Sequence, residues 1–337
     1  MVVGGAVRAT AGAICMYWAV SITLIFANKV LMSSAEYSIP APLFVTWVQC
    51  VETVAILWAL GMAKEARPDL PFLAQFPSPR VDSATLQAVA PLSVVFVVMI
   101  AANNVTLMNI PVSFYNVAKA LSVVFNVVLG YYVLGSVVSW RVLATLGVVV
   151  MGFLVGTTGD VQLDMMGTLF GVLSSAMSPL NSIMTKKVLP LVGEDKWVLS
   201  LYNNVNASLL FIPLMIIFGE VDTLRSHTHI LSSPHYWVIM LASGVLGFAI
   251  GIVIVMVIKH TSPLTFCLVG VLKNSIQTVL GVYFYGTIMS SGAVLSVVLV
   301  LVGSLLYTYV RSSESANEAD VVKTVNGSDD DDDECQA

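Results

Sequence analysis

Residues 111–135 read PVSFYNVAKALSVVFNVVLGYYVLG, and residues 263–286 read PLTFCLVGVLKNSIQTVLGVYFYG. Within these stretches, Asn126–Gly135 and Gln277–Gly286 are identical at five of ten positions. Glycine and proline recur at corresponding places, so a chance similarity between two apolar segments is a poor explanation. The chain therefore contains an internal repeat.

The composition places this repeat in a membrane. Hydrophobic residues make up 57% of the chain and charged residues only 10%, whereas soluble domains have about 45–50% and 25%. A membrane-spanning helix needs roughly 20 mostly apolar residues. The sequence predicts an all-α integral membrane protein with ten transmembrane helices, at 11–32, 42–62, 88–108, 112–134, 140–158, 165–185, 197–218, 236–258, 264–285 and 288–310.

The repeated unit has five of these helices. The fourth and fifth spans match the ninth and tenth, and Gly152 corresponds to Gly303. Because five is odd, the second unit enters the membrane upside down relative to the first. We expect two inverted five-helix repeats, residues 1–160 and 161–311, and a disordered acidic cytosolic tail, residues 312–337. Inverted repeats are typical of alternating-access carriers, whose substrate site lies near the midplane.

Lysine and arginine are distributed unequally between the two sides of the predicted membrane. One side carries eleven of them, in both termini and the even-numbered loops, and the opposite loops carry only Arg225. Positively charged loops stay in the cytosol. We therefore expect both termini to be cytosolic and the number of spans to be even.

Two lysines, Lys119 and Lys273, lie deep inside predicted spans, in helices that correspond in the two repeats. A cation at that depth costs at least about 2.5–3.5 kcal/mol and by default marks a functional site. Glu52 is the only acidic residue inside any predicted span, so it can neutralise at most one lysine. An anionic, phosphorylated substrate would supply the missing charge, although a structural pair of Lys119 with Glu52 is an alternative.

Other polar side chains in the spans are candidates for recognition. In the seventh span, Tyr202, Asn203 and Asn204 offer a stacking face and amide edges that suit a nucleobase, or they tie helices together. Neighbours of the two lysines are the next candidates: Tyr115 and Asn116 in the fourth span, and Gly270, Asn274 and Gln277 in the ninth. A gating or secondary role is expected for Asn28, Lys29 and Glu52.

Several classes of function lack support in the sequence. The four histidines lie in loops or at span ends, so we expect no catalytic centre and no enzyme activity. The cysteine spacing indicates neither a disulfide framework nor a zinc site, and we expect no metal and no cofactor. No basic patch suggests binding to nucleic acid.

Short segments that match a known family occur in nearly all the predicted spans: Asn28-Lys29, 44–46, Gln49-Cys50, 91–96, 114–117, 124–127, 185–190, 202–207, 247–251 and 261–265. On these segments the chain resembles the drug/metabolite transporter superfamily, in the branch of nucleotide-sugar and triose-phosphate transporters. The resemblance implies the ten-helix inverted-repeat fold. It also implies that Tyr202, Asn203 and Asn204 contact the nucleobase, that Gly270 and Lys273 contact phosphate and sugar, and that Lys119 binds phosphate.

The function implied by this resemblance is exchange across the Golgi membrane. We expect an antiporter that exchanges cytosolic GDP-fucose for lumenal GMP, with GDP-mannose, a UDP-sugar or a sugar phosphate as alternative substrates. The expected partners are a nucleotide sugar, a nucleoside monophosphate and the lipid bilayer. The oligomeric state stays open, with a homodimer as the candidate assembly.

Overall fold

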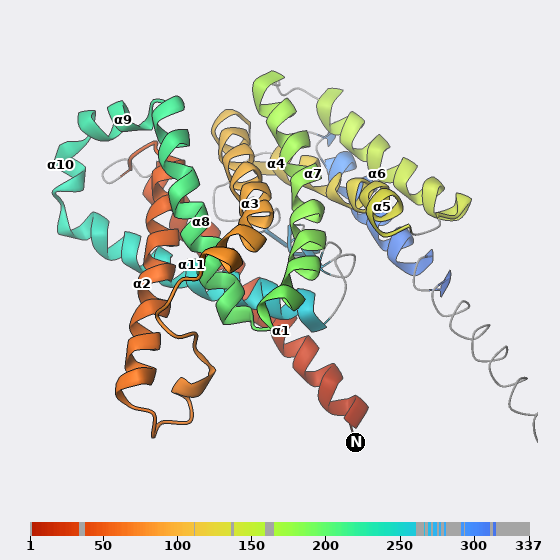
Figure 1. Cartoon of the computed structure of the whole chain (residues 1–337). Coiled ribbons are helices and arrows are strands. Elements are labelled where there is room, and N and C mark those ends of the chain that lie inside the picture. The colour runs from red at the N-terminus through yellow and green to blue at the C-terminus, as the bar shows by residue number, and fades with distance from the viewer. Residues whose placement is uncertain are drawn as a thin grey trace, which may run out of the picture.

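The computed structural model describes the backbone of residues 2–33, 38–110, 112–135, 138–158, 165–260, 266, 269–270, 272–274, 276–277, 280, 291–292, 294–310 and 313–314. Every regular element in these residues is helical (Figure 1). The α-helices are α1 (Val2–Ser33), α2 (Pro42–Ala66), α3 (Ser83–Asn109), α4 (Val112–Ala120), α5 (Ser122–Leu134), α6 (Trp140–Thr158), α7 (Met165–Val188), α8 (Lys196–Ile217), α9 (Glu220–Ser226), α10 (Thr228–Leu231) and α11 (Pro234–His260). Two 3₁₀ helices, η1 (Leu73–Gln75) and η2 (Leu189–Val192), join them, and residues 294–310 form one more helix.

Four of these helices are long and apolar enough to cross a membrane: Pro42–Ala66, Ser83–Thr106, Lys196–Ile217 and Pro234–Lys259. Shorter apolar helical stretches occupy four further predicted spans, at Ala11–Ile25, Val117–Val133, Trp140–Val155 and Val294–Val310. The ninth predicted span, 264–285, lies largely outside the described residues. The all-helical membrane class is confirmed, and the count of ten stays a prediction.

The fourth predicted span, 112–134, is not one continuous helix, which corrects the sequence-based expectation. It breaks at Leu121 into α4 and α5. Near the break, the Ser175 hydroxyl of α7 lies 2.8 Å from the Ala118 carbonyl and 2.8 Å from the Gly171 carbonyl of its own helix. The Leu121 N–H donates to the Ala118 carbonyl at 3.1 Å, one residue short of the α-helical spacing. The interruption therefore comes two residues after Lys119.

A distant carboxylate holds the start of α2. Glu220, in α9, accepts the backbone N–H groups of Leu43 and Phe44 through its two oxygens, at 2.9 and 2.8 Å. The first N–H groups of a helix have no partner within it, so this contact satisfies two of them. Burial raises the pKa of Glu220 above its ordinary value, although both hydrogen bonds act in the opposite direction.

The helix of residues 294–310, blue in Figure 1, crosses α6 through a reciprocal contact. A Cβ atom at Gly152 would lie 3.0 Å from the backbone nitrogen of Val300, and one at Gly303 would lie 3.0 Å from that of Val149. Each helix thus presents a glycine to a valine of the other helix, and the two glycines allow the backbones to approach closely.

The segment between α2 and α3 covers one end of the helices. Its Phe76 is buried and packs on Trp197 of α8, with ring centroids 4.8 Å apart, and Trp197 stacks on Phe248 of α11. The Lys64 ammonium group donates to the Phe76 carbonyl at 2.7 Å. This segment therefore joins α2 to α8 and α11 on the face that the charge distribution predicts to be cytosolic.

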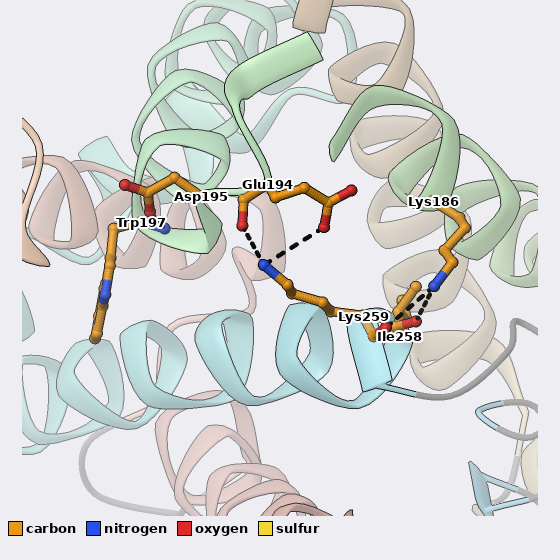
Figure 2. A network of polar contacts seen from close by, with 6 residues as sticks. All are labelled: Lys186, Glu194, Asp195, Trp197, Ile258 and Lys259. Carbon is orange, nitrogen blue, oxygen red and sulfur yellow. Dashed lines mark hydrogen bonds and ion pairs between the residues drawn. The ribbon is translucent and has the colours of Figure 1, made fainter. Parts of the chain in front are cut away.

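On the same predicted face, three elements are tied together at the end of α11 (Figure 2). Lys186 of α7 donates to the carbonyls of Ile258 and Lys259, at 3.2 and 3.1 Å. Lys259 in turn donates to the backbone carbonyl of Glu194 at 2.6 Å and pairs with its carboxylate at 3.4 Å. These contacts join α7 and α11 to each other and to the turn that precedes α8.

Candidate functional site

Lys119 lies at the end of α4, buried with 8% of its surface exposed. Its ammonium group is 3.5 Å from the Ser174 carbonyl of α7 and 5.8 Å from the centroid of the Tyr115 ring. Tyr115 is one helical turn before Lys119, so the two side chains share a face. Small residues of α7 make room for this arrangement, because a Cβ at Gly171 would already touch Ala118.

Lys273 is equally buried, and its surroundings have the same form. Its ammonium group donates to the Ser21 hydroxyl of α1 at 3.1 Å and lies 5.8 Å from the centroid of the Tyr17 ring. No carboxylate among the described residues is within ion-pair distance of it. A buried ammonium group with one hydroxyl and one aromatic face as partners keeps donor capacity for an anion.

The two lysine sites are connected through their tyrosines. The hydroxyls of Tyr17 and Tyr115 are near enough to interact electrostatically. Gly270 lies at the same place, since a Cβ there would be 3.9 Å from the Tyr17 hydroxyl. Tyr17 of α1 and Tyr115 of α4 are thus within electrostatic range of each other, and Gly270 lies beside Tyr17.

Tyr17 and Ser21 are site residues that the sequence analysis did not identify. They stand four residues apart in α1, and Asn28 follows seven residues after Ser21, so all three lie along one face of the helix. A search for polar residues at helical spacing in the first span would have found this stripe. Their partner in the ninth span could not be read from the sequence.

The remaining predicted neighbours of the two lysines differ in their burial and contacts. The Gln277 side chain is buried, and its amide oxygen has no hydrogen-bond partner. Asn274 is partly buried. The side chain of Asn116 lies outside the described residues, so its predicted role stays a prediction. The unsatisfied oxygen makes Gln277 the residue here with the clearest capacity to accept a hydrogen bond from a ligand.

The Tyr202–Asn204 motif of α8 faces α3. The Tyr202 hydroxyl accepts the backbone N–H of Asp82 at 2.9 Å, and the Asn203 side-chain oxygen accepts from the Ser93 hydroxyl at 2.9 Å. The Asn204 amide nitrogen donates to Ser200 of its own helix. In the described residues, the Asn203 amide nitrogen and the Asn204 amide oxygen keep free hydrogen-bonding capacity. Asn203 therefore keeps a donor group and Asn204 an acceptor atom for a ligand.

Helix α3 connects this motif with the lysines. Ser93 binds Asn203, and ten residues later Asn103 accepts from the Tyr115 hydroxyl at 3.4 Å. Ten residues of α-helix rise by about 15 Å. The amide motif and the Lys119 site are thus two ends of one stretch of α3, a separation that suits an elongated ligand.

Replacing Tyr202 by Phe tests whether its hydroxyl has a structural role. We expect the variant to lose roughly 0.5–1.5 kcal/mol of stability, because the Asp82 N–H loses its acceptor. The matched control is Tyr236→Phe, since the buried Tyr236 hydroxyl has no partner. Thermal unfolding of the two purified variants measures the difference. Equal stability of the two variants would contradict a structural role for the Tyr202 hydroxyl.

The predicted gating residues do not contact one another among the described side chains. Asn28 accepts from the Gln49 amide at 2.8 Å, and Gln49 also donates to Ser243 of α11 at 3.1 Å. The Lys29 side chain lies outside the described residues. Both oxygens of Glu52 are buried without a hydrogen-bond partner, so Glu52 is not paired with Lys119 in this conformation.

Comparison with known proteins decides the family. The model of the Triose-phosphate Transporter family matches residues 9–308. The chain belongs to this family. It is a multi-pass membrane protein of the transporter class, and the resemblance inferred from short segments in the sequence is confirmed over nearly the full set of helices.

Individual members of the triose-phosphate transporter family are similar along most of their length. GDP-fucose transporter 1 of Mus musculus is 43% identical, with 89% of this chain and 83% of that protein covered. The Golgi GDP-fucose transporter of Drosophila melanogaster is 39% identical, with 89% of each chain covered. A solved crystal structure at 15% identity superposes with a TM-score of 0.53, covering 91% of this chain and 98% of that one, and supports the fold.

Proposed function

We propose that this protein is a Golgi antiporter that exchanges cytosolic GDP-fucose for lumenal GMP by alternating access. The observation that carries the proposal is the environment of Lys273, a buried ammonium group with no carboxylate in reach among the described residues. Relatives named as GDP-fucose transporters at 39–43% identity support the choice of substrate.

The diphosphate would bind between the two lysines. Lysine is a compact cation that suits phosphate oxygens, and the matching tyrosine contacts of Lys119 and Lys273 support a shared role in binding it. Gln277 and Asn274 would hold the sugar or its phosphate, and Gly270 leaves room for the ligand to approach. The hydrogen bond between Lys273 and Ser21 would weaken when phosphate binds.

The guanine base would bind at the Asn203–Asn204 end. The base has a carbonyl that accepts a hydrogen bond and N–H groups that donate, and the two free amide atoms match this pair. The Tyr202 hydroxyl accepts from the Asp82 N–H in this conformation and keeps its own O–H as a donor, which could contact the base. The recognition end and the phosphate end are then both placed along α3.

Transport would proceed by rocking of two inverted repeats, 1–160 and 161–311. The reciprocal contact of Gly152 with Val300 and of Gly303 with Val149 supports this symmetry, because equivalent residues of two units meet only at their two-fold axis. The segment carrying Phe76 would close the cytosolic face in the conformation described, with both termini on that side. The acidic tail would remain in the cytosol.

Obligate exchange follows from the charge of the empty site. Moving an uncompensated ammonium group through the membrane interior is costly, so the empty carrier should reorient slowly. An anionic nucleotide restores neutrality and allows the return step. No catalytic step is involved in this cycle.

Counterflow in proteoliposomes tests the function and the base together. Vesicles loaded with GMP should take up GDP-fucose at least tenfold faster than empty vesicles or vesicles loaded with UMP, CMP or AMP. Equal uptake by empty vesicles would refute obligate exchange. Preference for internal UMP would favour a UDP-sugar, and competition by GDP-mannose or by sugar phosphates would identify the remaining alternatives in the same fold.

A further inference from the structure

Glu52 occupies a notch between two helices. It lies in the middle of α2, and its Oε2 atom fills the position that a side chain would take at Gly244 of α11. Both carboxyl oxygens are shielded from solvent, and neither has a hydrogen-bond partner. The site is therefore shaped for this side chain, and the described residues around it offer no group that stabilises a negative charge.

Gln49, one turn earlier on α2, shows the contrast. Its amide nitrogen donates to Asn28 of α1 and to Ser243 of α11. The same interface thus satisfies a neutral polar group at one turn and leaves a carboxyl group unsatisfied at the next. A buried polar group without partners costs free energy, and a buried charge without partners costs far more.

No charged group among the described side chains compensates Glu52 from a neighbouring element. Helix α3 and η1 contain no acidic or basic residue, and the Glu52 oxygens bond to nothing on the other elements. The Lys29 and His260 side chains lie outside the described part of the chain. The titratable residues on the elements packed against Glu52, and on α2 itself, are Arg8, Cys15, Tyr17 and Lys29 (α1), Cys50, Lys64 and Glu65 (α2), Lys196 and Tyr202 (α8), and His235, Tyr236, Lys259 and His260 (α11).

We propose that Glu52 is a proton-binding site: its carboxyl group holds a proton while α2 packs against α11, and releases it to water when these helices separate. Helices α2 and α11 belong to different predicted repeats. Binding of the proton therefore favours the arrangement in which the two repeats are packed together at α2 and α11, and its release favours their separation. The coupling to transport rests on the proposed function, whereas proton binding does not.

The test is the pH dependence of thermal unfolding for the full-length protein in detergent, without nucleotide. A carboxyl group that is protonated in the folded state and ionises readily in the unfolded state stabilises the fold at low pH. This stabilisation is lost as the pH rises above the range in which the glutamate ionises in the unfolded chain. Relative to Glu52→Gln, the folding equilibrium of the native protein should fall by up to tenfold per pH unit in that window.

The comparison with Glu52→Gln isolates this one group. Glutamine keeps the shape and cannot ionise, so its unfolding curve contains only the contributions of the other groups, including Glu220, which are common to both proteins. A native protein and variant with parallel pH profiles would overturn the proposal. Because nucleotide is absent, a wrong assignment of the transported substrate leaves this result unchanged.

A second variant keeps the test valid if Glu52→Gln does not fold. In Gly244→Ala, the new methyl group overlaps the position of the carboxyl group and displaces it from the notch. We expect the pH dependence to flatten in this variant. Gly251→Ala on the same helix is the control, since nothing lies within 4 Å of its Cβ position. Retention of the full pH dependence in Gly244→Ala would also overturn the proposal.

Discussion

Replacing Lys273 by Ala is expected to abolish exchange of GDP-fucose for GMP while leaving the protein folded. Removing one partner of a buried, hydrogen-bonded charge pair costs 2 kcal/mol or more, which corresponds to about a 30-fold or larger loss of nucleotide affinity. The fold should tolerate the change. Among the described residues, the side chain forms one hydrogen bond, to Ser21, and the variant no longer has to bury a cation in the membrane.

The measurements are uptake in proteoliposomes and the rise in melting temperature when GMP is added. Lys187→Ala is the matched control, because Lys187 is exposed at the end of α7 and belongs to no candidate site. The control should respond to GMP as the native protein does. Near-normal uptake by Lys273→Ala would remove this lysine from substrate binding and, with it, the main support for the proposed function.

Adding one methyl group at Gly152 or Gly303 is expected to destabilise the protein by about 1–3 kcal/mol at each site, as other overpacked cores do. A Cβ at Gly152 would lie 2.9 Å from the Val300 side chain, and one at Gly303 would lie 2.8 Å from the Val149 side chain. Each would also lie 3.0 Å from backbone nitrogen, which cannot rotate away. The two helices would have to separate.

Thermal unfolding of Gly152→Ala and Gly303→Ala measures this effect, and Gly147→Ala provides the control within α6. Nothing lies within 4 Å of a Cβ at Gly147. Alanine there should be neutral or stabilising, because alanine is a better helix former than glycine by about 1 kcal/mol. Similar losses at Gly152 and Gly303 are expected from the symmetry of the contact. A loss at only one of them would contradict an equivalent role of the two glycines.

Much of the helical layout could be predicted from apolar length alone. The second, third, seventh and eighth predicted spans coincide with α2, α3, α8 and α11 to within a few residues at most ends. The reason is that an apolar segment in a membrane has to form its backbone hydrogen bonds internally, as a helix does. The fourth span was predicted as one helix and is two. The Ser175 hydroxyl of α7 contacts the Ala118 carbonyl beside the break, and no local pattern around residue 121 reveals this contact.

The candidate site was predicted in part. Lys119 and Lys273 stood out because a charge in an apolar span is conspicuous without knowledge of its neighbours, and the structure shows both as buried. Tyr17 and Ser21 did not stand out, since tyrosine and serine are ordinary in such helices. The motif of Tyr202 was predicted to meet a nucleobase, whereas in this conformation its hydroxyl binds Asp82, and its contact with a base remains a prediction.

The sequence by itself determined the class of the protein, the approximate helices and the two buried lysines, because hydropathy and charge are properties of each segment alone. Only the tertiary structure decided that a tyrosine ring lies beside each lysine, that Gly152 and Gly303 meet each other's valine partners, and that Glu52 fills the notch at Gly244. These contacts join residues far apart in the chain. Which of them form is set by how whole helices pack against one another, and that packing depends on all the side chains together.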